Sequence, residues 1–432
     1  MPVLRNKASF SINAEQYELI KQRMLNWSKQ FSILLFLDSN GNRDKYSRYD
    51  CLMGAGMHNA KTISSLEDLH QFHTTNKDWL LGHINYDYKN NLEPKLSSCH
   101  EAVVGFPDFF FFQPLVVCYI PAGTNELIIE TLFAGPQQVY NEIINSPAEI
   151  TDDIPEVSFT RRTDKEVYLD TVDKLRQHIK EGDCYEINYC TEGYAEDVEI
   201  EPVAVFGALN KLSRAPFAAY YRNNHRYMVC ASPERYIRKG GDTILSQPIK
   251  GTARRGQDEA ADAAIKSELF NSIKDRAENV MITDLVRNDL ARSCETGSIQ
   301  VDELFGMYTF PQVHQMISTI SGRLGQGRPF TDVLRYSFPM GSMTGAPKIK
   351  VMELIDHYED TRRELFSGTV GYITPGAEFD FNVIIRSLFY NADTRRLSYQ
   401  SGGAITYDSI PESEWEEMRL KAWALERIFT KE

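Results

Sequence analysis

The sequence lacks the segments that would place a protein in a membrane or an oxidising compartment. Its amino end, MPVLRNKASFSI, has no apolar core of the kind found in signal peptides, so none is expected. The longest apolar run, residues 109–120, is interrupted by Gln113 and Pro114 and is too short to cross a bilayer. The seven cysteines are scattered, odd in number and without a CxxC pair, which is typical of reduced thiols. We therefore expect a soluble, cytoplasmic protein.

A surplus of positive charge is also missing. Lysine and arginine number 47 against 60 aspartates and glutamates, which gives a formal net charge of -13, and no basic cluster interrupts this balance. Such a surface repels phosphate backbones, so nucleic-acid binding is excluded. A small anion could bind only in a pocket that supplies its own positive charge or a metal ion.

What the sequence does contain is a mixed α and β pattern with enough apolar material for a large core. Of the 432 residues, 42% are hydrophobic. Strand-like runs dominate the first third, and proline and aspartate then interrupt the pattern near residues 145–162. We expect a boundary there, between an amino-terminal region (1–155) and a catalytic region (156–432). Helices and strands mix without a strict βαβ order, which indicates an α+β fold with extensive antiparallel sheet.

Local signals predict several elements of the second region. Thr163 and Glu166 have the spacing of a capping box, and Gly182 follows as a helix stop. The Gly–Gly pair within residues 239–242 predicts a hairpin turn. The segment ENVMITDLVRNDLA, residues 278–291, predicts a mostly buried helix because apolar residues occur around most of its circumference.

The last helix carries a file of charges beside its apolar stripe. Pro411 marks its start, and the stripe consists of Trp415, Met418, Ala422 and Leu425. Glu414, Glu417 and Lys421 each precede a stripe residue by one position, so they line the boundary between core and solvent. This file is either a surface Glu–Lys pair of about 0.2–0.5 kcal/mol or a magnesium-binding edge, since hard cations take oxygen ligands.

Two further groups of residues have both a structural and a chemical interpretation. Glu278 lies on the apolar helix, where a carboxylate needs either a structural partner or a metal ion. Glu234 and Lys250 flank the proposed hairpin within a residue or two of opposing each other. They are either an ordinary ion pair or a general acid beside a lysine nucleophile. A lysine attacks only as the neutral amine, whereas a carboxylate neighbour stabilises the ammonium form.

Two glycine-rich stretches, residues 341–348 and 401–406, are the remaining candidates. The first, GSMTGAPK, is not a Walker A loop because its Gly–Lys spacing is wrong and no G-K-[ST] follows. Both stretches are either plain turns or, together with Arg386, a set of backbone N–H groups and a guanidinium for a carboxylate.

As a set, these motifs resemble the chorismate-utilising enzymes. The resemblance covers roughly residues 160–430 and rests on PIKGT, ENVMITDLVRNDLAR, GSMTGAPK, SGTVGY, FNVIIRSL, SGGAIT and ESEWEEMRLKA in this order. The amino-terminal third is similar only loosely. The resemblance implies two interlaced α/β domains whose antiparallel sheets pack as a sandwich flanked by helices, with the active site between them.

The resemblance also implies roles for residues of this sequence. Glu278 and Glu417 fall on magnesium-ligand positions, with Glu414 close by, and the Mg²⁺ ion would hold a substrate carboxylate. His314, in PQVHQMIS, matches a histidine position near the substrate ring. The positions that grip the carboxylates of chorismate are Thr344, Tyr372, Arg386, Gly403 and Lys421.

Lys250 distinguishes between members of the family. PIKGT resembles the aminodeoxychorismate synthases, whereas anthranilate synthases have PIAGT. The resemblance implies that Lys250 attacks C2 of chorismate while the C4 hydroxyl departs with a proton from Glu234, and that ammonia then adds at C4. Glu186 stands where amine-forming members commonly have Gln and water-using members have Lys. Its carboxylate is compatible with holding or deprotonating ammonia.

The source of ammonia is expected to lie outside this sequence. The one G-x-C segment, residues 182–184, continues with Tyr rather than the Gly of a nucleophile elbow. Ammonia is therefore expected from a glutamine amidotransferase subunit (component II) or from solution. The alternatives are an anthranilate synthase component I and, in another class, a chorismate-binding subunit without catalysis of its own.

Overall fold

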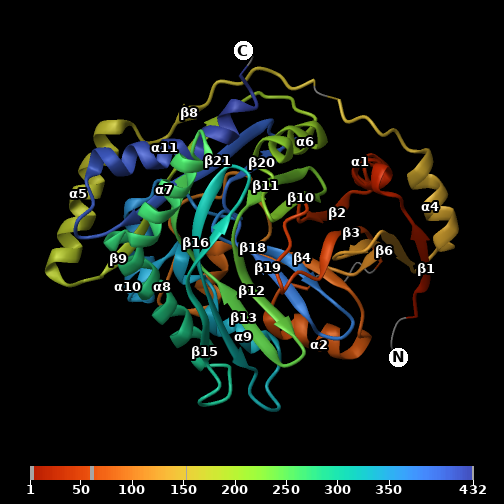
Figure 1. Cartoon of the computed structure of the whole chain (residues 1–432), viewed down its shortest axis with the longest axis horizontal. Coiled ribbons are helices and arrows are strands. Elements are labelled where there is room, and N and C mark those ends of the chain that lie inside the picture. Colours follow the sequence, from red (N-terminus) through yellow and green to blue (C-terminus); the bar gives the residue numbers. More distant parts are fainter. Residues whose placement is uncertain (1–3, 59–62, 152, 431–432) are drawn as a thin grey trace.

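A computed structural model describes residues 4–58, 63–151 and 153–430, and two large antiparallel sheets form its centre (Figure 1). The larger sheet has the strand order β1-β7-β6-β3-β2-β10-β11-β20-β21-β9-β17, with β8 beside β9. Its strands are β1 (Asn6–Ser11), β2 (Ile33–Asp38), β3 (Tyr49–Met57), β6 (Pro114–Pro121), β7 (Glu126–Thr131), β8 (Thr160–Arg161), β9 (Glu186–Ala195), β10 (Phe217–Asn223), β11 (Arg226–Ser232), β17 (Gly345–Ala346), β20 (Ser387–Asn391) and β21 (Arg396–Ile405).

The smaller sheet has the order β14-β16-β13-β12-β19-β18-β4-β5, with β15 beside β16. Its strands are β4 (Leu80–Ile84), β5 (Phe109–Phe112), β12 (Arg235–Gly240), β13 (Thr243–Gln247), β14 (Ile249–Arg254), β15 (Gln300–Thr309), β16 (Val313–Arg323), β18 (Thr369–Ile373) and β19 (Phe379–Asn382). Strands from both halves of the chain therefore contribute to each sheet.

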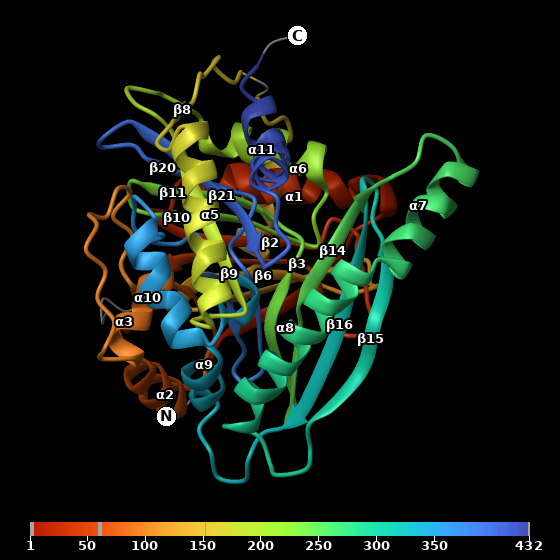
Figure 2. The same ribbon diagram turned by 90° about the vertical axis from the view of Figure 1, so that its left-hand side faces the viewer.

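Helices cover the outer faces of both sheets. α8 lies along β14 and β16, α11 packs on β21, and α10 packs on β9 (Figure 2). The helices are α1 (Tyr17–Ser28), α2 (Leu66–Asn76), α3 (Lys89–Leu92), α4 (Pro136–Asn145), α5 (Lys165–Glu181), α6 (Pro202–Ser213), α7 (Glu259–Asn271), α8 (Ile273–Ala291), α9 (Thr331–Ser337), α10 (Lys348–Tyr358) and α11 (Pro411–Arg427). Short 3-10 turns are η1 (Ala14–Gln16), η2 (Tyr86–Tyr88) and η3 (Gly341–Met343).

The main core lies between the two sheets. Side chains such as Leu35 and Tyr221 from the larger sheet meet Leu81 and Phe381 from the smaller one, and all four are fully buried. A second cluster lies between the larger sheet and helices α1, α4, α6 and α11. These layers confirm the predicted α+β fold with antiparallel sheets packed as a sandwich and flanked by helices.

Most of the predicted local elements are present. α11 begins at Pro411 and buries its predicted apolar stripe, the hairpin pairs Gly240 with Thr243, and α5 ends at Gly182 in the left-handed conformation. The predicted capping residue was wrong. Asp164 caps α5, because its carboxylate accepts a hydrogen bond from the Val167 N–H.

The helix predicted at residues 278–291 is present within α8, but it is less buried than expected. Val280 is 44% exposed, and only one side of α8 packs against the sheet. Apolar residues around the circumference therefore did not mean complete burial, because one of them faces solvent. Among the described residues, no helix is long and apolar enough to cross a membrane.

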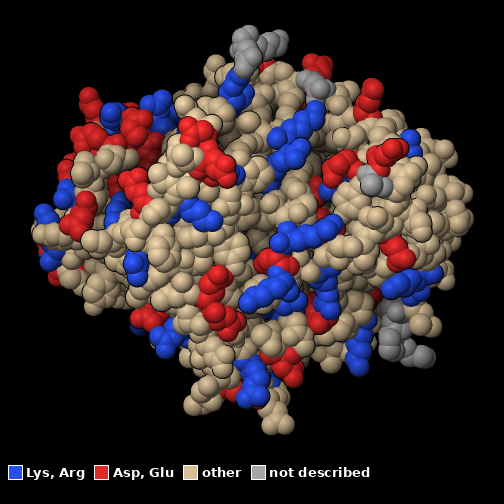
Figure 3. Space-filling model, viewed as in Figure 1, with Lys and Arg blue, Asp and Glu red and all other residues tan. Residues whose placement is uncertain are grey.

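The charge of the surface is unevenly distributed. On the face shown in Figure 3, acidic side chains gather at the upper left, whereas lysines and arginines stand singly or in small groups elsewhere. This distribution agrees with the formal net charge of -13 and presents no broad basic surface on this face. An anion that approaches this face would therefore meet no extended positive surface.

Candidate active site

A cleft of about 990 Å³ lies between the two sheets and is bounded by α8 and α11. Side chains from the predicted set that line this cleft are Glu234, Lys250, Glu278, Arg386, Glu417 and Lys421. They come from segments far apart in the sequence, so the fold brings together what the motifs only suggested. Their chemical roles stay predictions.

Lys250 enters the cleft from an irregularity in β14. Ile249 pairs with Ile317 and Thr252 pairs with Gln315, so two residues of β14 oppose one residue of β16. Gly251 has a φ of +94°, which a side chain rarely adopts. Such bulges re-aim side chains beside active sites.

The partner of Lys250 is Glu186, at the start of β9. The Lys250 Nζ and Glu186 Oε1 atoms are 2.5 Å apart, and both side chains are buried. Burial lowers the pKa of Lys250, but the carboxylates of Glu186 and Glu278 outweigh this effect and leave its pKa above the usual value. Within the described chain, the second oxygen of Glu186, Oε2, is buried and has no hydrogen-bond partner.

Glu234 is buried in the segment that joins β11 to β12. Its backbone is fixed by hydrogen bonds from its N–H to the Ser232 hydroxyl and from the Val383 N–H to its carbonyl. Burial raises the pKa of Glu234 to about 7, and a hydrogen bond with Ser342 and the charge of Lys250 oppose this rise only in part. A carboxyl group with this pKa is protonated in about half of the molecules at pH 7 and can donate a proton.

Three carboxylates converge at the side of the cleft formed by α8 and α11. Lys274 lies between two of them, with its Nζ 3.9 Å from Glu278 Oε1 and 3.7 Å from Glu414 Oε1. Glu417 pairs with Lys421 at 2.8 Å. Burial raises the pKa of Glu278 to about 7 and raises that of Glu414, whereas Lys421 lowers that of Glu417.

The β21 backbone closes this carboxylate cluster. A Cβ atom at Gly403 would lie 3.4 Å from Glu414 Oε2 and 3.6 Å from Lys421 Nζ. Lys421 also donates a hydrogen bond to the Gly402 carbonyl, at 2.9 Å. Arg386 faces the same cleft, where burial lowers its pKa and the charge of Glu417 opposes that effect. Positive and negative groups thus alternate along this wall.

Thr344 lies deeper than the resemblance implied. Its side chain is completely buried, and its hydroxyl donates hydrogen bonds within the η3 turn, to the Met340 and Gly341 carbonyls. The neighbouring Ser342 and Met343 line the cleft instead. The hydrogen bonds of Thr344 therefore stabilise the η3 turn, which forms part of the cleft wall.

His314 points away from the cleft. Its two ring nitrogens contact Asp262 at 2.9 Å and Thr309 at 3.0 Å. The next residue on β16, Gln315, lines the cleft, is 3% exposed, and has a side-chain oxygen for which the described residues offer no donor. Because successive side chains of a strand alternate between its faces, strand register could have identified Gln315.

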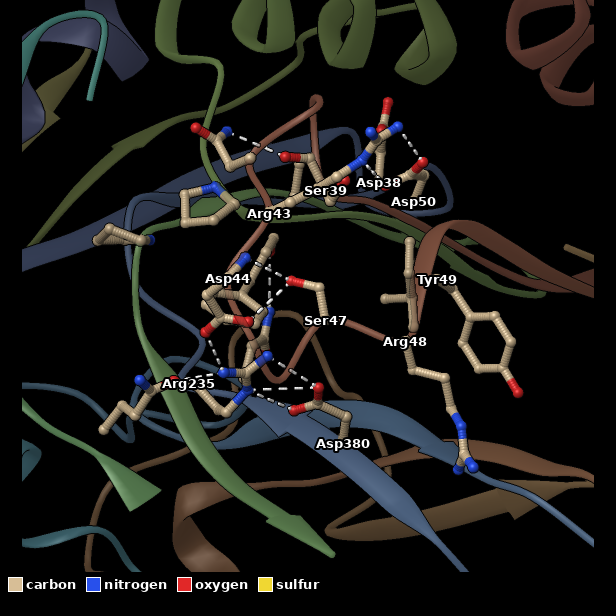
Figure 4. A pocket seen from close by; sticks show the side chains of 18 of the residues that line it. Asp38, Ser39, Arg43, Asp44, Ser47, Arg48, Tyr49, Asp50, Arg235 and Asp380 are labelled. Atoms are coloured by element: carbon tan, nitrogen blue, oxygen red, sulfur yellow. Dashed lines mark hydrogen bonds and ion pairs between the residues drawn. The ribbon is translucent and has the colours of Figure 1, made fainter. Parts of the chain in front are cut away.

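Tyr372 lines a different cavity, of about 230 Å³, which is shown in Figure 4 around Arg235 and Asp380. In this second cavity, Arg235 donates to Asp380 at 3.0 Å and to Asp44 at 2.8 Å. Arg43 pairs with Asp50 at 2.5 Å. The structure therefore does not bring Tyr372 together with Lys250. The two cavities share part of a wall, formed by Pro216, Pro233, Ile249 and Phe310.

Several curated proteins named aminodeoxychorismate synthase are similar in sequence to this chain. It is 33% identical to "Aminodeoxychorismate synthase component 1" of Bacillus subtilis, over 80% of this chain and 76% of the relative. It is 41% identical to the protein of that name from Salmonella typhimurium, over 57% of this chain and 54% of the relative. The "Aminodeoxychorismate synthase" of Streptomyces griseus is 40% identical over 62% of this chain, which spans only 37% of that longer protein.

Solved structures show the same fold. Anthranilate synthase component I from Streptococcus pneumoniae superposes with a TM-score of 0.76 at 22% identity, covering 98% of this chain and 92% of that one. The menaquinone-specific isochorismate synthase of Escherichia coli gives 0.78 at 15% identity, covering 99% and 95%. The family profile described as "chorismate binding enzyme" matches residues 33–427, and the chain thus belongs to the chorismate-binding enzyme family.

Proposed function

We propose that this protein is the aminating component of an aminodeoxychorismate synthase, which converts chorismate and ammonia to 4-amino-4-deoxychorismate, a precursor of 4-aminobenzoate and folate. The observation that carries the proposal is a buried lysine, Lys250, within one cleft with a carboxylate cluster and with Glu234, whose burial raises its pKa to about 7. Relatives with this activity in their names support it.

The carboxylate cluster of Glu278, Glu414 and Glu417 fits a magnesium ion. Glu278 Oε1 is buried and finds no hydrogen-bond partner among the described residues, and the ammonium of Lys274 contacts two members of the cluster. Oxygen ligands gathered around a cation are what Mg²⁺ requires. When bound, the ion supplies positive charge to one carboxylate of chorismate, while Arg386 and Lys421 offer charge to the substrate from the same wall.

Glu186 prepares the nucleophile. At 2.5 Å from Lys250 Nζ, its carboxylate can take one proton from the ammonium group and leave the neutral amine that attack requires. The amine then forms a bond to C2 of chorismate. When the lysine later departs from C2, the same carboxyl group returns the proton. This assignment places Glu186, rather than Glu234, opposite Lys250.

Glu234 protonates the departing C4 hydroxyl, which would otherwise leave as hydroxide. The C4–O bond breaks with the shift of the ring double bond, and the oxygen leaves as water. Ammonia then forms a bond to C4, and the lysine is expelled from C2 with its electron pair. Since Glu186 and Lys250 exchange one proton back and forth, the net reaction converts chorismate, ammonia and one proton from Glu234 to water and the product with a C4 ammonium group.

Ammonia is supplied by a separate glutamine amidotransferase subunit, or by an ammonium salt in the test tube. The names of the relatives, which designate a component 1, support the existence of a second component. The nitrogen donor therefore reaches this chain as ammonia rather than as glutamine.

Product identification tests the proposal. The purified protein is incubated with chorismate, magnesium chloride and ammonium chloride, and the products are identified by mass spectrometry. We expect 4-amino-4-deoxychorismate. Anthranilate together with pyruvate would instead assign an anthranilate synthase component, and no turnover of chorismate would indicate a binding subunit.

A further inference from the structure

Glu234 lines a second space in addition to the cleft. It lines a small cavity of about 20 Å³ between β12, α8 and η3. A cavity of about 10–15 Å³ is enough for one water molecule if polar partners surround it. Besides Glu234, the polar side chains that line this rear cavity are Ser246, Asp289, Ser337 and Ser342.

Asp289 connects the rear cavity to the exterior. Its carboxylate accepts a hydrogen bond from Lys348 Nζ at 2.7 Å, and Lys348 also donates to the Ser337 carbonyl at 3.0 Å. The side chain of Lys348 is 16% exposed, whereas that of Asp289 is 9% exposed. These two residues belong to the motifs RNDLAR and GAPK, for which the catalytic steps above provide no role. Polar groups thus extend from the back of Glu234 toward solvent.

The proposed reaction consumes one proton from Glu234 in every turnover, and the present inference rests on that reaction. When chorismate occupies the cleft, it covers the face of Glu234 toward which the C4 hydroxyl leaves. The nitrogen of ammonia keeps its three hydrogens in the C4 ammonium group of the product, so it returns no proton to Glu234. The acid must therefore regain its proton before the next substrate reacts, and the rear cavity offers a route that substrate does not block.

We propose that Glu234 is reprotonated from behind, through one water molecule in the rear cavity that receives its proton from Asp289. In this step an O–H bond of the Asp289 carboxyl breaks, an O–H bond of water forms and another breaks, and an O–H bond of Glu234 forms. Asp289 then recovers a proton from solvent beside Lys348. Burial raises the pKa of Asp289, although Lys348 opposes this effect, so its carboxyl group holds a proton more readily than an exposed aspartate.

Two variants interrupt this route in different ways. Asp289→Asn removes the proton donor but keeps an oxygen for Lys348. Val286→Leu adds a methylene group to a residue that lines the rear cavity, so it displaces the water and leaves every charged group in place. Val286→Ala is the matched control, because it enlarges the cavity. If Asp289→Asn fails to fold, Val286→Leu still tests the inference.

Rapid-mixing kinetics provide the readout. Protein, chorismate, magnesium and ammonium chloride are mixed below the Glu234 pKa of about 7, where the first turnover starts with a protonated acid. We expect both variants to form about one equivalent of product at a rate within about twofold of the unmodified protein. Later turnovers should slow at least about tenfold, with a larger solvent deuterium isotope effect on kcat.

Two results overturn the inference alone. One is a steady-state rate equal to that of the unmodified protein in both variants. The other is an equal loss in the first and later turnovers, which would mean that the residues are needed only for structure. Absence of aminated product from the unmodified protein would overturn the proposed function and this inference together.

Discussion

The cleft that holds Lys250 and the second cavity around Arg235 are both lined by charged residues, but these charges are paired differently. In the second cavity, Arg235 is held by Asp44 and Asp380, and Arg43 is held by Asp50. In the cleft, buried oxygens of Glu278 and Gln315 find no hydrogen-bond partner among the described residues, whereas the atom of this kind in the second cavity is the neutral hydroxyl of Ser39. A buried polar group without a partner costs free energy unless a ligand supplies one. The difference teaches that the cleft is arranged to receive charge, whereas the paired charges of the second cavity hold its walls.

Removal of the Lys250 amine should have the largest effect. Because Lys250→Ala cannot form a bond to C2, we expect amination to fall by about 10⁴-fold or more. Lys239→Ala is the control, since Lys239 is also largely buried but its Nζ contacts the Gly241 carbonyl outside the cleft. Product formation from chorismate and ammonium chloride is the measurement, and a rate near that of the unmodified protein would refute covalent participation.

Glu234→Gln should lower kcat by about 10²–10⁴-fold, because glutamine cannot protonate the leaving hydroxyl. The pKa of Glu234 is about 7, so the protonated acid is lost as pH rises through that value. At a fixed concentration of free ammonia and saturating magnesium, kcat of the unmodified protein should therefore decrease above pH 7. The variant should show no such decrease. A profile that is the same in both proteins would exclude Glu234 as the acid.

Removal of a buried cation from the second cavity should instead lower the free energy of unfolding. Arg235→Met leaves the partly exposed carboxylates of Asp44 and Asp380 without their buried cation, so the loss should lie toward the lower end of the about 3–5 kcal/mol expected when one partner of a buried pair is removed. Chemical denaturation gives the free energy of unfolding. Lys250→Ala, measured alongside, should lose much less stability than activity. Similar stability of Arg235→Met and the unmodified protein would contradict the contrast between the two cavities.

Glu417→Gln should weaken magnesium binding, with a smaller effect on activity than the changes above. One carboxylate of the cluster is lost while Glu278 and Glu414 remain, so we expect the magnesium concentration for half-maximal activity to rise at least about tenfold. Glu412, which is exposed on the same helix and does not line the cleft, provides the matched control, Glu412→Gln. If the magnesium dependence is unchanged, Glu417 is not a ligand.

The smallest effect is expected at Tyr372. Tyr372→Phe removes a hydroxyl that faces the second cavity rather than the cleft, so KM for chorismate should stay within about twofold of its original value. Steady-state kinetics at saturating magnesium are sufficient. A large increase in KM would return Tyr372 to the substrate-binding set.

The sequence predicted those features that depend on local pattern or on distinctive motifs. The stripe of α11 follows from helical spacing, and the charged file beside it indeed faces the cleft at Glu417 and Lys421. It did not predict the partner of Lys250. Glu186 lies on another sheet, 64 positions away in the chain, so the contact depends on how the sheets pack. Nor did it distinguish His314 from Gln315, because one position of register decides which face a strand residue occupies.

Each sheet contains strands from both sides of the predicted boundary, and this limits how the chain can be divided into fragments. β10 pairs with β2, and β18 pairs with β4, across the boundary predicted at residues 155 and 156. A fragment that starts at residue 156 would leave the N–H and C=O groups along both strands uncovered. Open edges of this kind recruit other strands and promote aggregation. The carboxyl-terminal portion expressed alone would therefore be prone to aggregate. Fusions or tags should be attached at the ends of the whole chain instead of at this boundary.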